Sequence, residues 1–270
     1  MFEEPYRWID AIRNRRDYVE DQLASGSPVV ALPYADGALL ATVGGGTPKL
    51  YEIYDQIAFG AIGHPADIEK LRSVVLDAAH VEGFSRSPAD VTLRRLLKFG
   101  LAPALKLAFE EVLHAPFIAR IVMAEVNLHS GQPLFVRLNY DGVFEETEAG
   151  LALGPTAAAT RRMQAYLHAA GDAADRPLAT ALQLALRTWA VAQLVAPVKG
   201  DTTPAAEPHA SGSDLEHEPV PAAAALDAEL RPLDRKRFEI GLIDRRQRGS
   251  AKYRTPTAAE LDAALAGILG

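Results

Sequence analysis

The sequence predicts an α+β protein, and the order of its apolar segments carries that prediction. Short apolar runs separated by turn residues come first, at residues 26–63, and a second such group follows at 117–146. A pair of segments with helical spacing follows each group, at 65–113 and at 156–194. This order favours two stacked sheets between two pairs of helices, although periodicity alone also allows other α+β packings.

The first group of apolar runs predicts a meander of four strands. The turn residues Asp36-Gly37 separate the first two runs, which is the pattern of a β-hairpin, and a Gly44-Gly45-Gly46 turn comes before the other two. Because the runs are nearly continuous, we expect helices or a second sheet to cover at least one face. The four predicted strands are 29–32, 38–43, 50–53 and 57–62.

Helices are predicted on both sides of this meander. Residues 5–24 form an amphipathic pattern with apolar residues at helical spacing. The next helix spans 65–81 and should stop at Gly83. Ser87 then caps a longer segment that runs to about residue 113, in which Pro103 should mark a kink or a break because proline removes an internal hydrogen bond.

The last third of the chain changes character. Residues 197–230 are rich in Pro, Ala and acidic residues and predict a flexible loop. Basic residues then flank a predicted strand at 238–244; they suit a solvated strand edge better than a nucleic-acid surface. Finally, Thr257 and Glu260 form a capping box that opens a helix through residue 269.

Bulk properties narrow the function classes. The 270 residues are 49% apolar and carry a net charge of −7, which argues against a nucleic-acid partner. The chain has no cysteine, and its start lacks the pattern of a signal peptide, so we expect a cytoplasmic protein without disulfides. No apolar stretch is long enough for a membrane span, and the histidines show no metal-binding spacing. We expect neither a metal nor a cofactor.

The order and spacing of several weak sequence signals resemble those of the α-type subunits of the 20S proteasome, and the bacterial branch is the closer match. The first is a strand pair followed by a loop ending in Lys49, the run KLYEIYDQIAFGAIG and a helix that begins just after Gly63. The similarity covers residues 5–194 and 237–244. Its later signals are Ala115-Pro116-Phe117 before a strand at 118–126, the Tyr140-Asp141-Gly142 turn, Gly154 before a helix, and the strand at 238–244.

This resemblance implies the N-terminal-nucleophile hydrolase fold, a four-layer αββα sandwich. It divides the chain into an N-terminal gate segment and ring-packing helix (1–24), the core (25–196), a flexible acidic loop (197–234) and a final strand and helix (235–270). It also implies a non-catalytic subunit that forms the outer heptameric rings of the protease and stacks on catalytic β subunits. The gate residues would be Met1, Phe2, Glu3 and Glu4.

The resemblance also gives Lys49 a role. A lysine at this place lines a pocket between neighbouring α subunits, which receives the C-terminal carboxylate of a ring ATPase or another activator. That ATPase would feed protein substrates, including those tagged with the ubiquitin-like Pup. A lysine ammonium at a partly desolvated site suits an anion. The alternative is an exposed lysine in a surface turn.

Two other functions are open. Cleavage after Gly26 would make Ser27 a self-processed serine nucleophile, whose free α-amine would act as the base. Lys49 would then stand where the active-site lysine of β-type subunits falls. Against this, Pro28 stiffens the cleavage site, residues 5–23 look like a packed helix, and the carboxylate expected after the second strand is absent, since Ala41-Thr42-Val43-Gly44 stands there. The other alternative is a stand-alone ring or scaffold protein of the same fold.

Overall fold

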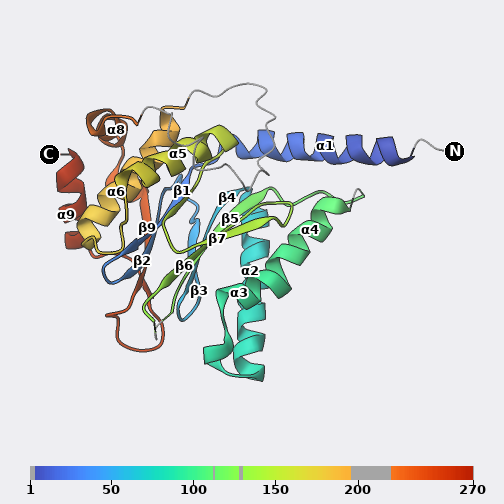
Figure 1. Ribbon diagram of the computed structural model, residues 1–270, viewed down its shortest axis with the longest axis horizontal. Coiled ribbons are helices and arrows are strands. Elements are labelled where there is room, and N and C mark those ends of the chain that lie inside the picture. Colours follow the sequence, from blue (N-terminus) through green and yellow to red (C-terminus); the bar gives the residue numbers. More distant parts are fainter. Residues whose placement is uncertain (1–3, 112, 128–129, 196–219, 270) are drawn as a thin grey trace.

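Two five-stranded antiparallel sheets form the centre of the chain in a computed structural model that describes residues 4–111, 113–127, 130–195 and 220–269 (Figure 1). The first sheet has the order β10-β9-β2-β1-β8 and the second the order β3-β4-β5-β6-β7. The strands of the first sheet are β1 (Val29–Tyr34), β2 (Gly37–Val43), β8 (Leu151–Leu153), β9 (Phe238–Asp244) and β10 (Tyr253–Arg254). Those of the second are β3 (Leu50–Tyr54), β4 (Ile57–Gly63), β5 (Ala119–Val126), β6 (Pro133–Leu138) and β7 (Phe144–Thr147).

Alternate residues of β1 and β2 enter two different cores. Val30 and Leu39 face a cluster formed with helices α5 (Ala157–Ala170) and α6 (Leu178–Gln193). Their neighbours Val29 and Leu40 face a second cluster formed with β3, β4, β5 and β6 of the other sheet. Both faces of the first sheet are therefore buried, which explains its nearly continuous apolar runs.

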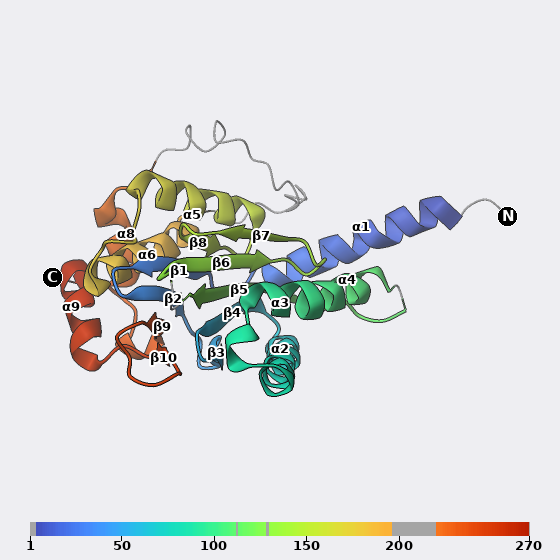
Figure 2. The same cartoon turned by 60° about the horizontal axis from the view of Figure 1, so that its bottom comes forward.

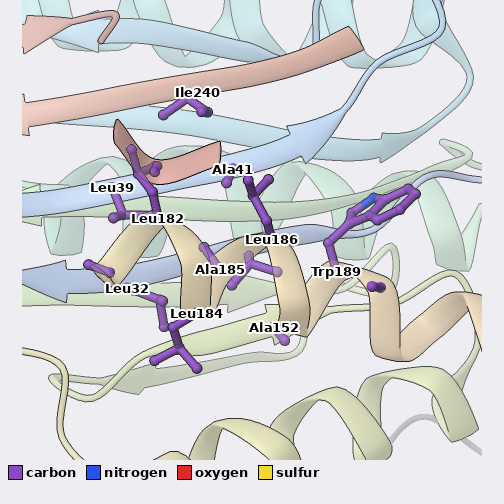
Figure 3. Packing of buried hydrophobic residues seen from close by; sticks show 14 of the residues in the cluster. Leu32, Leu39, Ala41, Ala152, Leu182, Leu184, Ala185, Leu186, Trp189 and Ile240 are labelled. Carbon is purple, nitrogen blue, oxygen red and sulfur yellow. The ribbon is translucent and has the colours of Figure 1, made fainter. Parts of the chain in front are cut away.

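Helix α6 makes the broadest contact with the first sheet. Figure 3 shows Leu182, Leu186 and Trp189 of α6 directed toward β2, the strand that carries Leu39 and Ala41. On the second sheet a separate apolar cluster joins β4, β5 and β6 to α2 (Pro65–Ser85), α3 (Leu93–Leu96) and α4 (Ala102–Glu110). Figure 2 shows α5 and α6 on one side of the two sheets and α2 and α4 on the other.

The first helix, α1 (Glu4–Leu23), is only partly attached to this body. Val19 and Leu23 near its end are fully buried, whereas Trp8 and Ile9 are 48% and 53% exposed. Figures 1 and 2 both show the N-terminal half of α1 projecting beyond the sheets. The amphipathic helix is confirmed, and its apolar side is covered only near its C-terminal end.

The predicted end of α2 at Gly83 is wrong, because the helix continues to Ser85. Gly83 lies in the last turn, where a Cβ atom would come within 2.4 Å of Tyr54 Oη. The glycine therefore allows β3 to pack closely against α2 and does not cap the helix.

The predicted break near Pro103 is confirmed, and it has the form of a π-helical segment, η2 (Leu97–Leu101), that joins α3 to α4. Pro103 lies in the first turn of α4 and cannot donate to a carbonyl of the preceding turn, so the helix widens there. Upstream, Ser87 accepts from Ala89 N at 3.3 Å, as its predicted capping role requires, but the helix that it opens is only the short 3₁₀ helix η1 (Pro88–Asp90).

The predicted loop at 197–234 is wrong over its last part, where α8 (Ala223–Leu230) forms. Leu226 and Leu230 are fully buried against the first sheet's helices, and Asp227 receives two hydrogen bonds from Arg187, at 2.7 and 3.0 Å. Ala and Leu are strong helix formers, so the composition of these eight residues differs from that of the preceding segment. Residues 196–219 of the predicted loop lie outside the described residues.

The capping box at the end of the chain is confirmed. Glu260 N donates to Thr257 Oγ1 at 3.3 Å and Thr257 N donates to Glu260 Oε2 at 2.7 Å, at the start of α9 (Ala258–Leu269). The remaining short helix, η3 (Arg235–Arg237), leads directly into β9. Among the helices that the structure describes, none has the length and apolar character needed to cross a membrane.

Candidate functional site

Lys49 lies at the end of the glycine-rich turn that connects β2 to β3, and the turn thus passes from one sheet to the other. Gly46 has a positive φ of 115°, which favours glycine, and the space around Gly45 and Gly46 is open. Residues 45–48 are exposed, whereas Lys49 is half-buried and Leu50 is buried. Lys49 therefore lies where an open turn enters the core.

The start of β9 holds both ends of this turn. Gly44 N donates to Arg237 O at 2.7 Å, and Arg237 Nε donates to Gly44 O at 3.2 Å. At the other end, Lys49 N and Leu50 N both donate to Glu239 Oε1, each at 2.7 Å. The backbone of Lys49 is therefore fixed although the preceding residues are exposed.

Among the residues that the structure describes, the ammonium group of Lys49 has no acidic partner. Within the described parts of the chain, no carboxylate oxygen lies within 4.0 Å of Lys49 Nζ. Burial lowers the pKa of Lys49, and the negative charge of Glu239 opposes that effect. A partly desolvated cation without a counter-charge can bind an anion such as a carboxylate.

Neighbouring charges on the same surface are already paired. Tyr51 donates its hydroxyl to Pro48 O at 2.7 Å, and the guanidinium of Arg72 lies 4.9 Å from the centre of the Tyr51 ring. Arg72 in turn forms an ion pair with Glu69 on α2. Lys49 and the exposed Lys236 and Arg237 are cations near this turn that have no acidic partner among the described residues.

Ser27 lies at the same end of the first sheet, but its hydroxyl group is already engaged. It donates to Val43 O at 2.7 Å, accepts from Trp189 Nε1 at 3.0 Å and lies 3.4 Å from Thr42 Oγ1. None of these partners is a base, and Lys49 is not among them. Thr42 carries a hydroxyl group and not the carboxylate expected near a nucleophile, and this hydroxyl donates to Pro28 O at 2.6 Å.

The Gly26–Ser27 bond, where the self-processing hypothesis places cleavage, follows a tightly packed turn. Gly26 N donates to Leu23 O at 2.8 Å, which ends α1. A Cβ atom on Gly26 would come within 2.2 Å of Ile62 Cγ2, so the backbone lies directly against β4. The segment before Ser27 is therefore part of the packed fold.

A pocket of about 520 Å³ lies at the opposite end of the first sheet, and Lys49 is not among its lining residues. Its charged groups are paired with one another: Arg254 contacts Asp244 and Glu260 at 2.7 and 2.8 Å, and Arg246 contacts Asp36 at 2.7 Å. Hydrogen bonding from Arg254 lowers the pKa of Glu260 to about 2. Among the described residues, no cluster of His, Asp and Glu could hold a metal ion.

The predicted gate residues fall largely outside the structure. Met1, Phe2 and Glu3 are not among the described residues, and Glu4 begins α1 with a side chain that is not described. Glu239, Arg237 and Trp189 also belong to this region, and local sequence patterns did not single them out. For Glu239 one signal was available, since an acidic residue at the second position of a largely apolar strand is unusual.

Curated relatives decide the family. No family model matches the chain. It is 31% identical over 177 residues to a proteasome subunit alpha of Parafrankia, and the match covers 65% of this chain and 71% of that protein. The chain belongs to the proteasome α-subunit family. Similar matches to this α-subunit family occur in Paenarthrobacter aurescens (33% identical; 66% of this chain, 74% of that protein) and Streptosporangium roseum (35%; 65% and 66%).

Proposed function

We propose that this chain is a non-catalytic α subunit of a 20S proteasome core particle. It forms the outer heptameric rings, templates assembly with catalytic β subunits and restricts substrate entry with its N-terminal segment. Family membership and the two helix-covered sheets support this proposal, and we interpret the layers as the four-layer αββα arrangement of N-terminal-nucleophile hydrolases. In this proposal residues 1–24 form the gate and ring helix, 25–196 the core, 197–234 the acidic segment that includes α8, and 235–270 the final core strand and C-terminal helix.

We further propose that Lys49 binds the C-terminal carboxylate of a ring ATPase that unfolds and feeds protein substrates, including Pup-tagged ones. The observation that carries this proposal is the half-buried Lys49 ammonium, which has no acidic partner within the described residues but has a fixed backbone. A carboxylate that reaches it would supply the missing counter-charge. The open Gly45–Gly46 turn leaves space for a peptide to approach.

The absence of a catalytic role is also a proposal, and the surroundings of Ser27 support it. An N-terminal nucleophile needs a free α-amine beside its hydroxyl group, and hence cleavage after Gly26. Here α1 packs through Val19 and Leu23, and the Ser27 hydroxyl donates to a backbone carbonyl. Both features favour an intact, structural N-terminal segment.

Two measurements test the proposed function. The first is native and denaturing mass spectrometry of the purified chain: we expect a full-length monomer mass and a sevenfold or fourteenfold assembly. Loss of the first 26 residues would instead make Ser27 a nucleophile. A full-length chain that never co-purifies with a β subunit would favour a stand-alone ring protein.

The second measurement tests Lys49 in the mixed α/β complex. Lys49→Glu should abolish ATPase-stimulated protein degradation and leave basal hydrolysis of short peptides nearly unchanged, because only activator docking loses its cation. Lys98→Glu is the matched control, since Lys98 is exposed on η2 and undergoes the same charge reversal. Unchanged stimulation in Lys49→Glu would remove the docking assignment.

A further inference from the structure

Glu239 connects the two sheets at the Lys49 turn. It is the second residue of β9 and pairs with Thr42 in the first sheet, whereas its side chain reaches the residues that begin β3 in the second sheet. One oxygen, Oε1, accepts both the Lys49 and the Leu50 amide hydrogens, each at 2.7 Å. Two backbone amides that converge on one carboxylate oxygen form a strong, charge-assisted contact.

The orientation of this carboxylate leaves the lysine ammonium free. Oε2 lies on the Gly44 side of the turn, where a Cβ atom on Gly44 would be 3.4 Å from it. Neither Glu239 oxygen lies within 4.0 Å of Lys49 Nζ, although the charge of Glu239 acts on the pKa of Lys49. The group that could neutralise Lys49 is thus bound to the Lys49 backbone instead.

We propose that Glu239 is the positioning residue of the Lys49 anion site. Its carboxylate fixes the Lys49 backbone through two amides, and because it is occupied there, it leaves the ammonium available for the terminal carboxylate of a bound peptide. This inference rests on the proposed docking role of Lys49. It adds Glu239 as the residue that keeps the Lys49 ammonium available for an incoming anion.

Other charged and titratable groups around Glu239 do not compete for that role. Tyr51 on β3 and Tyr253 on β10 are within reach of its charge, and burial, reinforced by this charge, raises the pKa of Tyr51 and raises that of Tyr253 to about 12. Glu52 adds to the effect on Tyr253. Arg237 directs its Nε to Gly44 O. Among the described residues near Glu239, Lys49 is thus a half-buried cation whose charge is available to a ligand, whereas the unpaired Arg237 is exposed.

Two substitutions at Glu239 separate its backbone contacts from its charge. Glu239→Gln keeps a carbonyl oxygen that can accept both amide hydrogens but removes the negative charge. Glu239→Ala removes both and leaves two partly buried amides without an acceptor. Both are compared with the unchanged chain and with Lys49→Ala, in the full-length assembled protein.

The binding probe is a fluorescent peptide that carries the last ten residues of the cognate ring ATPase, measured by anisotropy. The same peptide with an amidated C terminus is the control. Glu239→Ala should weaken binding of the free-acid peptide by about tenfold or more, the size expected from losing hydrogen bonds to a charged group. Glu239→Gln should stay within about threefold of the unchanged chain, since its backbone contacts remain.

The second readout needs no ligand. The rate at which acetic anhydride acetylates Lys49, followed by peptide mass spectrometry across pH, reports how strongly this ammonium holds its proton. Because the charge of Glu239 stabilises the protonated form, Glu239→Gln should move the alkaline inflection for Lys49 to lower pH. The inflection for Lys98 should stay in place. If the Glu239 charge did not act on the Lys49 ammonium, both inflections would stay unchanged.

The outcomes separate the two ideas. If Lys49→Ala binds the free-acid peptide as tightly as the unchanged chain, the docking role fails, whatever Glu239 does. If Lys49→Ala loses binding while Glu239→Ala retains it, or while both Glu239 variants lose it equally, the positioning role fails. An unmoved Lys49 inflection in Glu239→Gln also overturns it, and this readout remains usable if Glu239→Ala does not fold.

Discussion

Ser27 and Lys49 lie at the same end of the two sheets and differ in where their polar partners are. The Ser27 hydroxyl group has its partners inside the chain, since it donates to Val43 O and accepts from Trp189 Nε1. The Lys49 ammonium is half-buried, and the structure gives it no carboxylate partner among the described residues. A polar group with all its partners in the fold contributes to stability, whereas one without them costs stability and suits an external ligand.

This comparison predicts that substitutions around Ser27 change stability and that substitutions of Lys49 change binding. The two regions should therefore respond oppositely in the same unfolding experiment. All variants are compared at one protein concentration, because assembly makes the apparent stability concentration-dependent.

The largest effect should come from Trp189→Ala. Trp189 is 6% exposed, packs in the core between α6 and the first sheet, and donates to Ser27. Removing the indole leaves a cavity, so the free energy of unfolding should fall by about 3–5 kcal/mol. Trp189→Phe keeps most of the volume and should cost less. Chemical denaturation measures both, and a Trp189→Ala variant as stable as the unchanged chain would contradict the structural role of this network.

Ser27→Ala should have an intermediate effect. It leaves Trp189 Nε1 without its acceptor and Val43 O without its donor, so we expect a loss of about 1–2 kcal/mol. Degradation by the assembled complex should be unaffected, because the proposed chemistry lies in the β subunits. Ser250→Ala, at an exposed position, is the matched control. A loss of peptidase activity in Ser27→Ala with unchanged stability would reverse the assignment of this residue.

Sequence reasoning found the parts of the fold that depend on neighbours along the chain. Local patterns predicted the runs of β1 to β4, the Thr257–Glu260 capping box and the break at Pro103. The three-residue β8 and the two-residue β10 were missed, because such short strands are defined by their partners β1 and β9. Helix α8 was missed because its eight residues, mostly Ala, Leu and Glu, were averaged with a longer segment of different composition.

The same limit applies to the candidate site. The sequence and its resemblance pointed to Lys49, since the glycine turn and the following strand are contiguous. Glu239 lies 190 residues further along the chain, and only the pairing of β9 with β2 brings it to the Lys49 amides. Trp189 reaches Ser27 across 162 residues in the same way. Side chains that act through long-range pairing leave little trace in local patterns.

The smallest effect, and the one with the opposite sign, should come from Lys49→Met. Burial lowers the pKa of Lys49 below its ordinary value of 10.5, so the folded chain holds this proton less tightly than the unfolded chain. Stability should therefore rise with pH between the lowered pKa and 10.5, where the unfolded chain binds more protons. Lys49→Met should lose this rise and unfold at neutral pH with an equal or higher free energy, within about 0.5 kcal/mol because the ammonium is partly solvated. The matched control is Lys98→Met, measured by denaturation at several pH values; a clear destabilisation in Lys49→Met would mean that Lys49, like Ser27, serves the fold itself.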